Sequence, residues 1–149
     1  MYHCIMDPRV ANLKNVTDCE SFAVSARERG APDLADQARK RGIQIRAEVY
    51  GATSAVEREC LSAVYAYEEV LSAKKGKRQP ASRTWQMIKR LGIVPAVERV
   101  VTKRVVSTGF TALAEMGLME FAFEAVILRH PGSFSSEATA ISRDRLDAK

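Results

Sequence analysis

The stretch 55–73 constrains this chain most, because its apolar residues recur three and four positions apart. That spacing places them on one stripe of a helix, the pattern of an amphipathic helix packed on a core. The stripe comprises Val56, Cys60, Ala63, Val64, Tyr67, Val70 and Leu71. A capping box precedes it, with Ser54 as N-cap and Glu57 three residues later. The pattern therefore predicts a helix over 55–73.

Residues 43–50 carry the strongest competing strand signal. Apolar and polar side chains alternate strictly there, as they do in a half-buried strand. Read as a helix, the same stretch continues an apolar face that begins at Ala35 and passes through Gly42. A lone strand without a partner leaves its backbone N–H and C=O groups unpaired. We therefore predict one helix over 33–50, with a strand as the alternative.

Five more helices are predicted from apolar spacing and from the Gly, Pro and capping residues at their ends. They span 18–29, 83–91, 96–106, 111–130 and 137–147. Thr17 with Glu20 forms a capping box for the first, and Ser135 or Ser136 caps the last. The β-branched residues of 96–106 lower helix propensity, so a strand is the alternative in that segment.

The predicted fold is all-α: a single compact domain of six or seven helices with orthogonal or bundle-like packing. Residues 1–16 show no clear period, so we expect a flexible N-terminal arm before a domain over 17–149. A chain of 149 residues is long enough to bury a sizeable core. No apolar run approaches the roughly 18 residues of a membrane span, and the N-terminus lacks the pattern of a secretory signal. We expect a cytoplasmic protein without membrane contact.

Basic residues are concentrated in the centre of the sequence. Residues 1–69 and 108–149 each have a charge balance of −2, whereas residues 70–107 carry ten basic groups and one acidic group. No acidic residue lies between Glu69 and Glu98. A merely soluble face usually interleaves both signs, and localised positive charge attracts polyanions. The basic central segment 74–104 is therefore the candidate binding surface.

The helix predicted over 83–91 separates into an apolar and a basic side. Trp85 lies on the apolar side with Ile88 and Leu91, so we expect it to anchor the helix in the core rather than to stack on bases. The basic side faces outward and adds its cations to those of the preceding loop.

The helices 83–91 and 96–106, joined around Gly92, suggest a helix-turn-helix. The match is partial, because Ile88 stands where that motif has a small residue and Glu98 stands where it has an apolar one. The hypothesis of a helix-turn-helix therefore stays open, beside ordinary packing of two short helices.

We expect a small non-enzymatic protein that binds nucleic acid, DNA rather than RNA. The predicted phosphate contacts are Lys74, Lys75, Lys77, Arg78, Arg83, Lys89 and Arg90. Arg99, Lys103 and Arg104 are predicted as secondary contacts, which read bases if the helix-turn-helix is genuine. The alternative is a helical adaptor or oligomer whose basic surface docks on an acidic protein surface.

The sequence has no Gly-rich phosphate loop, no G-x-S-x-G and no H-E-x-x-H motif, and we predict no enzyme activity, metal or cofactor. Glu120 and Glu124 share a helix face, but the chain has no Glu-x-x-His motif to complete a metal site. We therefore expect both carboxylates to be solvated. His130 ends a predicted helix, where an imidazolium interacts favourably with the helix dipole. Cys19 and Cys60 lie on apolar helix faces and are interpreted as small hydrophobic residues.

Overall fold

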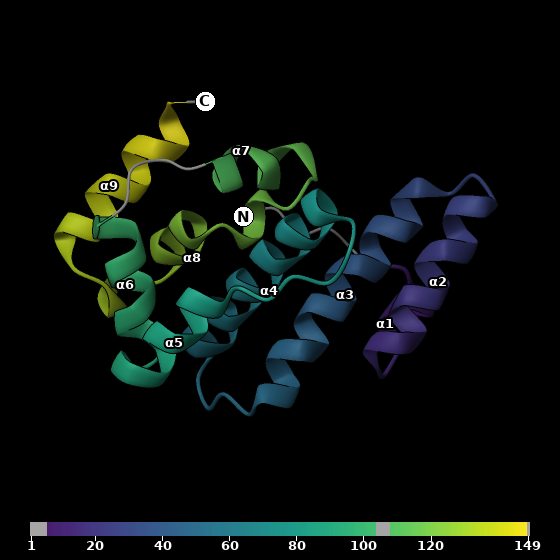
Figure 1. The fold of residues 1–149 in the computed structure, drawn as a ribbon, viewed down its shortest axis with the longest axis horizontal. Coiled ribbons are helices and arrows are strands. Elements are labelled where there is room, and N and C mark those ends of the chain that lie inside the picture. Colours follow the sequence, from purple (N-terminus) through teal and green to yellow (C-terminus); the bar gives the residue numbers. More distant parts are fainter. Residues whose placement is uncertain (1–5, 104–107, 149) are drawn as a thin grey trace. The chain divides into compact units, whose positions relative to one another are not determined.

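The computed structural model describes residues 6–103 and 108–148 (Figure 1). It confirms the all-α class, since these residues form nine α-helices, two short 3-10 helices and no strand. Among them, no helix combines the length and the hydropathy that crossing a membrane requires. The contacts divide the chain into two units, Met1–Gly51 and Ala52–Lys149.

The first unit contains α1 (Pro8–Ala11), α2 (Val16–Glu28) and α3 (Pro32–Tyr50). Helices α2 and α3 pack on each other through small side chains. These are Ala23, Ala26, Ala35 and Ala38. Helix α3 confirms the helix predicted over 33–50, so the strand alternative is wrong. The cap of α2 also differs from the prediction: the side chain of Asn15, not Thr17, accepts from the backbone N–H of Asp18, at 2.8 Å.

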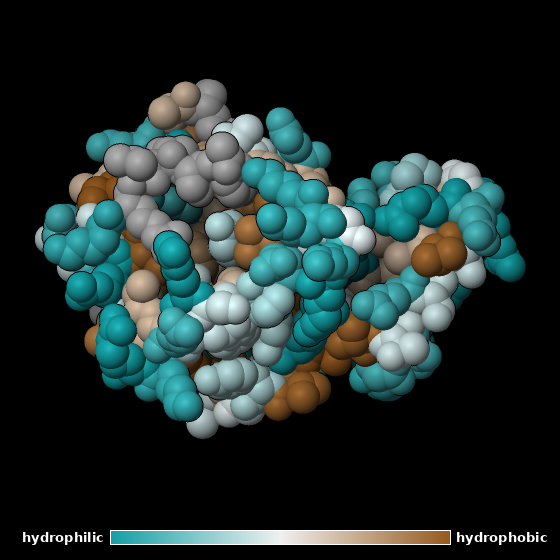
Figure 2. All heavy atoms as spheres, viewed as in Figure 1, coloured by the Kyte–Doolittle hydropathy of each residue, from teal (hydrophilic) through white to brown (hydrophobic). Residues whose placement is uncertain are grey.

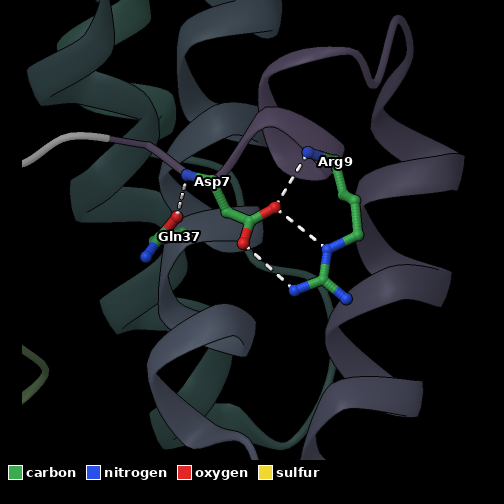
Figure 3. A network of polar contacts seen from close by, with 3 residues as sticks. All are labelled: Asp7, Arg9 and Gln37. Atoms are coloured by element: carbon green, nitrogen blue, oxygen red, sulfur yellow. Dashed lines mark hydrogen bonds and ion pairs between the residues drawn. The ribbon is translucent and has the colours of Figure 1, made fainter.

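Helix α1 was not predicted, and it is attached to α3 (Figure 3). Asp7 caps α1: its Oδ1 accepts from the backbone N–H of Arg9 at 2.9 Å, and its two oxygens accept from the Arg9 guanidinium at 3.0 Å. The backbone N–H of Asp7 donates to Gln37 Oε1 of α3 at 2.7 Å. Val10 is fully buried. Within the arm expected over 1–16, Pro8–Ala11 is helical, and residues 1–5 lie outside the described part.

The second unit is built on α4 (Ala55–Lys75), which contacts several later helices. The predicted N-cap is confirmed: Ser54 Oγ accepts from the backbone N–H of Glu57 at 3.2 Å. The reciprocal bond of a capping box is displaced by one residue, since Glu57 Oε1 accepts from the backbone N–H and the hydroxyl of Thr53. Three further helices are α5 (Ser82–Leu91), α6 (Ile93–Lys103) and α9 (Ser136–Asp147). A core joins α4, α6, α8 (Phe123–Arg129) and α9. Its buried members are Cys60, Ala63, Val97, Val101, Val126, Ile127, Phe134 and Ala138.

The single helix predicted over 111–130 is wrong. It is divided into α7 (Thr108–Glu115), a 3-10 helix (Met119–Phe121) and α8. The division falls at Gly117, whose φ of 71° is left-handed. Gly117 N–H bonds to Ala114 O at 3.1 Å and Leu118 N–H to Leu113 O at 2.8 Å, the paired bonds of a Schellman motif. A glycine in this conformation ends the helix because side-chain residues are strained there.

Glu124 was expected to be solvated, and this is wrong: it is 7% exposed. Its Oε2 lies 2.9 Å from Arg145 Nη1 of α9. Burial of a carboxylate is tolerated because a buried cation and hydrogen bond compensate for lost water. Glu120 is exposed as expected. Both glutamates lie on the same face of the predicted helix. The packing of α8 on α9 buries Glu124, whereas Glu120 stays exposed.

His130 follows α8 as its C-cap, next to a second 3-10 helix (Pro131–Ser133). Its Nε2 lies 3.1 Å from Glu59 Oε2, within ion-pair distance when the imidazole is protonated, although their orientation does not form a hydrogen bond. Arg129 Nε donates to Glu59 Oε1 at 2.7 Å. His130 thus lies at the end of α8, as predicted, and close to a carboxylate of α4.

Candidate nucleic-acid interface

The predicted phosphate contacts lie on consecutive elements of the second unit: the end of α4, the loop 76–81, α5 and α6. Nine of the ten predicted cations fall within the described residues, and all nine are exposed. They are Lys74, Lys75, Lys77, Arg78, Arg83, Lys89, Arg90, Arg99 and Lys103. Arg104 lies outside the described residues. Figure 2 shows hydrophilic side chains gathered over α5 and α6 on the face in view.

A buried glutamate of α4 sets the start of α5. Glu68 is 6% exposed, and its Oε2 accepts from the backbone N–H of Ala81 at 2.8 Å and from Trp85 Nε1 at 2.6 Å. Ala81 is the N-cap of α5 and offers no side-chain cap of its own. A carboxylate at a helix N-terminus is favourable because it meets unpaired N–H groups and the positive end of the dipole. Ser82 is the first residue of the helix.

Trp85 anchors α5 as predicted, with a polar tie that the prediction lacked. Its ring is half-buried and packs against Tyr65 of α4, with centroids 5.2 Å apart and planes tilted by 53°. Thr84 and Ile88 are buried on the same side of α5. Leu91, placed on the apolar side by the helical wheel, is 38% exposed. The indole is therefore engaged within the protein and is not presented as a stacking platform.

The loop between α4 and α5 is held by α4 as well. Gly76 ends α4 with a left-handed φ of 70°, and its N–H bonds to Ser72 O at 2.9 Å. Ser72 Oγ accepts from the backbone N–H of Gln79, also at 2.9 Å. Lys77 and Arg78 lie between these two tied points. The loop therefore brings its cations back beside α4 and delivers the chain to the start of α5.

Helix α6 is packed by its apolar side and keeps its cations outward. Val97 and Val101 enter the core, while Arg99 and Lys103 are exposed. Glu98 is committed to α9: its Oε1 accepts from the backbone N–H of Ser135 at 3.0 Å, and its Oε2 accepts from the Ser135 hydroxyl. The one acidic residue of the segment is thus occupied at the N-cap of another helix.

The connection between α5 and α6 is one residue, Gly92, with a φ of 99°. A helix-turn-helix has a turn of about three or four residues, so this connection is shorter than the motif requires. Glu98, which interrupts the apolar pattern of the motif, is explained by its bonds to Ser135. We therefore assign no base-reading role to α6.

The predicted cations follow one another along the end of α4, the loop 76–81, α5 and α6. The loop cations and Arg83 lie on either side of the N-cap of α5, Ala81, whose backbone N–H is bound by Glu68. Arg90 lies seven positions further along α5, about 10 Å away at the rise of an α-helix. The cations of α6 follow beyond Gly92 along the chain, on a helix that packs against α5.

Sequence reasoning missed Glu68, Ser72 and Glu98 as organisers of this surface. Glu68 bonds to Trp85, 17 positions away, and Glu98 bonds to Ser135, 37 positions away. No pattern within a single segment of the sequence predicts hydrogen bonds between residues so far apart. The missing acidic residues between Glu69 and Glu98 did indicate the basic surface, but not how it is held.

Among residues 6–103 and 108–148, no three His, Cys, Asp or Glu side chains gather in a way that would hold a metal ion. Comparison of the chain with models of protein families, with curated proteins and with solved structures finds no match.

Proposed function

We propose that this protein binds nucleic acid through the basic central segment 74–104, with DNA preferred over RNA. One observation carries the proposal: all nine described cations of the segment are exposed, on consecutive elements, with no acidic residue between Glu69 and Glu98. Such a surface suits contacts to phosphate oxygens, which fix a protein on nucleic acid without reading its sequence. The binding we propose is therefore non-specific or only weakly specific.

The state of Trp85 supports double-stranded rather than single-stranded nucleic acid. Proteins that bind single strands without sequence preference commonly stack bases on exposed aromatic rings. Here the indole N–H is bonded to Glu68 and the ring packs on Tyr65. A phosphate backbone held by cations needs no such ring, so a duplex is the better ligand.

The experiment measures binding of a labelled mixed-sequence DNA duplex by fluorescence anisotropy over a salt series. If seven cations contact phosphate, the logarithm of the binding constant falls with the logarithm of salt with a slope of about −6. Between about 50 and 200 mM salt this amounts to a loss of roughly 10³- to 10⁴-fold. A single DNA strand of the same length should bind more weakly than the DNA duplex. An RNA duplex should also bind more weakly than the DNA duplex.

Two variants, each with three cations reversed in charge, test where on the chain the duplex binds. Lys77→Glu, Arg78→Glu and Arg83→Glu together should reduce the magnitude of the salt slope by about 3 and weaken binding strongly. The matched control reverses three exposed cations of the first unit, Lys14, Arg27 and Arg29, with the same change in net charge. This control should retain most of the affinity, because those residues lie outside the segment.

Three outcomes would contradict the proposal. The unaltered chain fails to bind the duplex at low salt, or the control loses as much affinity as the segment variant, or the chain binds polyglutamate but not the duplex at equal ionic strength. The last result would favour an acidic protein surface as the partner.

A further inference from the structure

The loop that carries Lys77 and Arg78 follows α4 in a defined register. Glu68 and Ser72 are four positions apart, one helical turn, so their side chains lie on the same side of α4. The two N–H groups that they bind, those of Ala81 and Gln79, are two positions apart. Four helical residues rise about 6 Å, and two residues of extended chain span at most about 7 Å. The rise from Glu68 to Ser72 along α4 therefore matches the span from Gln79 to Ala81 along the loop.

Pro80 lies between the two bound residues and has no N–H group. At this position the loop therefore has no donor that would need a third acceptor on α4. With the bond from Gly76 N–H to Ser72 O, the loop is tied at its first residue, at Gln79 and at Ala81. The loop is thus ordered by α4 before any ligand arrives.

We infer that Glu68 and Ser72 are positioning residues for nucleic-acid binding, an inference that rests on the proposed function. They do not touch the ligand. They hold the loop cations in a fixed place relative to Arg83, at the start of α5. A loop whose backbone is already ordered avoids the cost of ordering that backbone on binding. Releasing it should therefore weaken binding even though every cation is still present.

The test compares Glu68→Ala, Glu68→Gln and Ser72→Ala with the unaltered chain in the duplex assay. Glu68→Ala should weaken binding roughly three- to tenfold, from the ordering cost of one loop residue, and reduce the magnitude of the salt slope by about 1 to 2. Glu68→Gln should restore both, because the two bonds end on a single oxygen that an amide carbonyl can replace. Ser72→Ala should give a smaller loss in the same direction.

Charge alone predicts the opposite sign. Removing a carboxylate from beside a basic surface makes that surface more positive, which strengthens attraction to phosphate. A loss in Glu68→Ala that Glu68→Gln reverses therefore reports positioning. A purely structural role would lower the melting temperature of Glu68→Ala and leave affinity unchanged well below it. The indole N–H signal of Trp85 in a ¹H–¹⁵N spectrum shows directly whether the bond to residue 68 is intact.

The outcomes separate the two proposals. If the unaltered chain binds the duplex and all three variants bind it equally well, with equal slopes, the positioning role is refuted and the proposed function stands. If the unaltered chain does not bind the duplex, both are refuted. Should Glu68→Ala fail to fold, Ser72→Ala decides the question, because it removes one hydrogen bond from a half-buried side chain.

Discussion

Breaking the ion pair between Glu124 and Arg145 should destabilise the second unit strongly. The two side chains keep only 9% and 13% of their surface exposed, and Arg145 Nη1 lies 2.9 Å from Glu124 Oε2. Arg145→Met removes the cation and leaves a carboxylate with little water around it. Removing one partner of a buried pair costs about 3–5 kcal/mol. Because some water access remains, we expect the lower end, about 3 kcal/mol.

Urea unfolding followed by the fluorescence of Trp85 measures this loss, since Trp85 is the only tryptophan of the chain and lies in the same unit. With a slope of about 2 kcal/mol per molar urea, the midpoint should fall by roughly 1.5 M. The matched control is Arg143→Met, an exposed arginine on the same helix, which should change the free energy of unfolding by less than about 0.5 kcal/mol.

A double variant tests the physical reason. Glu124→Leu with Arg145→Met replaces both charges by apolar side chains, so no charge is left buried, and most of the lost stability should return. The reasoning is refuted if Arg145→Met stays within about 0.5 kcal/mol of the unaltered chain. It is also refuted if the double variant is less stable than Arg145→Met.

Three further predictions concern α4 and its neighbours. Ser54→Ala should lower the free energy of unfolding by about 1 kcal/mol, because it removes the cap of α4, and thermal unfolding measures this. Burial raises the pKa of the Cys60 thiol to about 12, so a disulfide exchange reagent at neutral pH should label it only after unfolding; rapid labelling of Cys60 itself in the folded chain, located by peptide mapping, would contradict this. Burial raises the pKa of Glu59, but the hydrogen bond from Arg129 and the close contact with His130 outweigh it and leave that pKa below its ordinary 4.5. The stabilisation from Glu59 is therefore present above that value and is lost as the pH falls through the lower folded pKa. Glu59→Gln should flatten the acid limb of stability against pH, and an unchanged limb would refute this origin.

The helices of this protein were largely predictable, because each depends on signals within its own segment. The apolar stripe and serine cap of α4 and the serine cap of α9 are local features, and the structure confirms them. Helix α3 could be chosen over a strand because a strand needs a partner that no other segment offered. The error at 111–130 arose from reading through Gly117, a local stop signal that was outweighed by the apolar residues on both sides.

The basic central segment could likewise be located from charge order alone, and its nine described cations are exposed as expected. Only the tertiary structure decided which groups the acidic residues around this segment bind and whether those residues are buried. Glu68, Glu98 and Glu124 each bond to groups 13 to 37 positions away, and burial depends on which helices pack over them. The charge of a glutamate and its helix face can be predicted from the sequence. Its hydrogen-bonding partner lies on another segment and depends on how the helices pack. For that reason the sequence alone determined where the positive charge lies, and the packing of the helices determined how it is held.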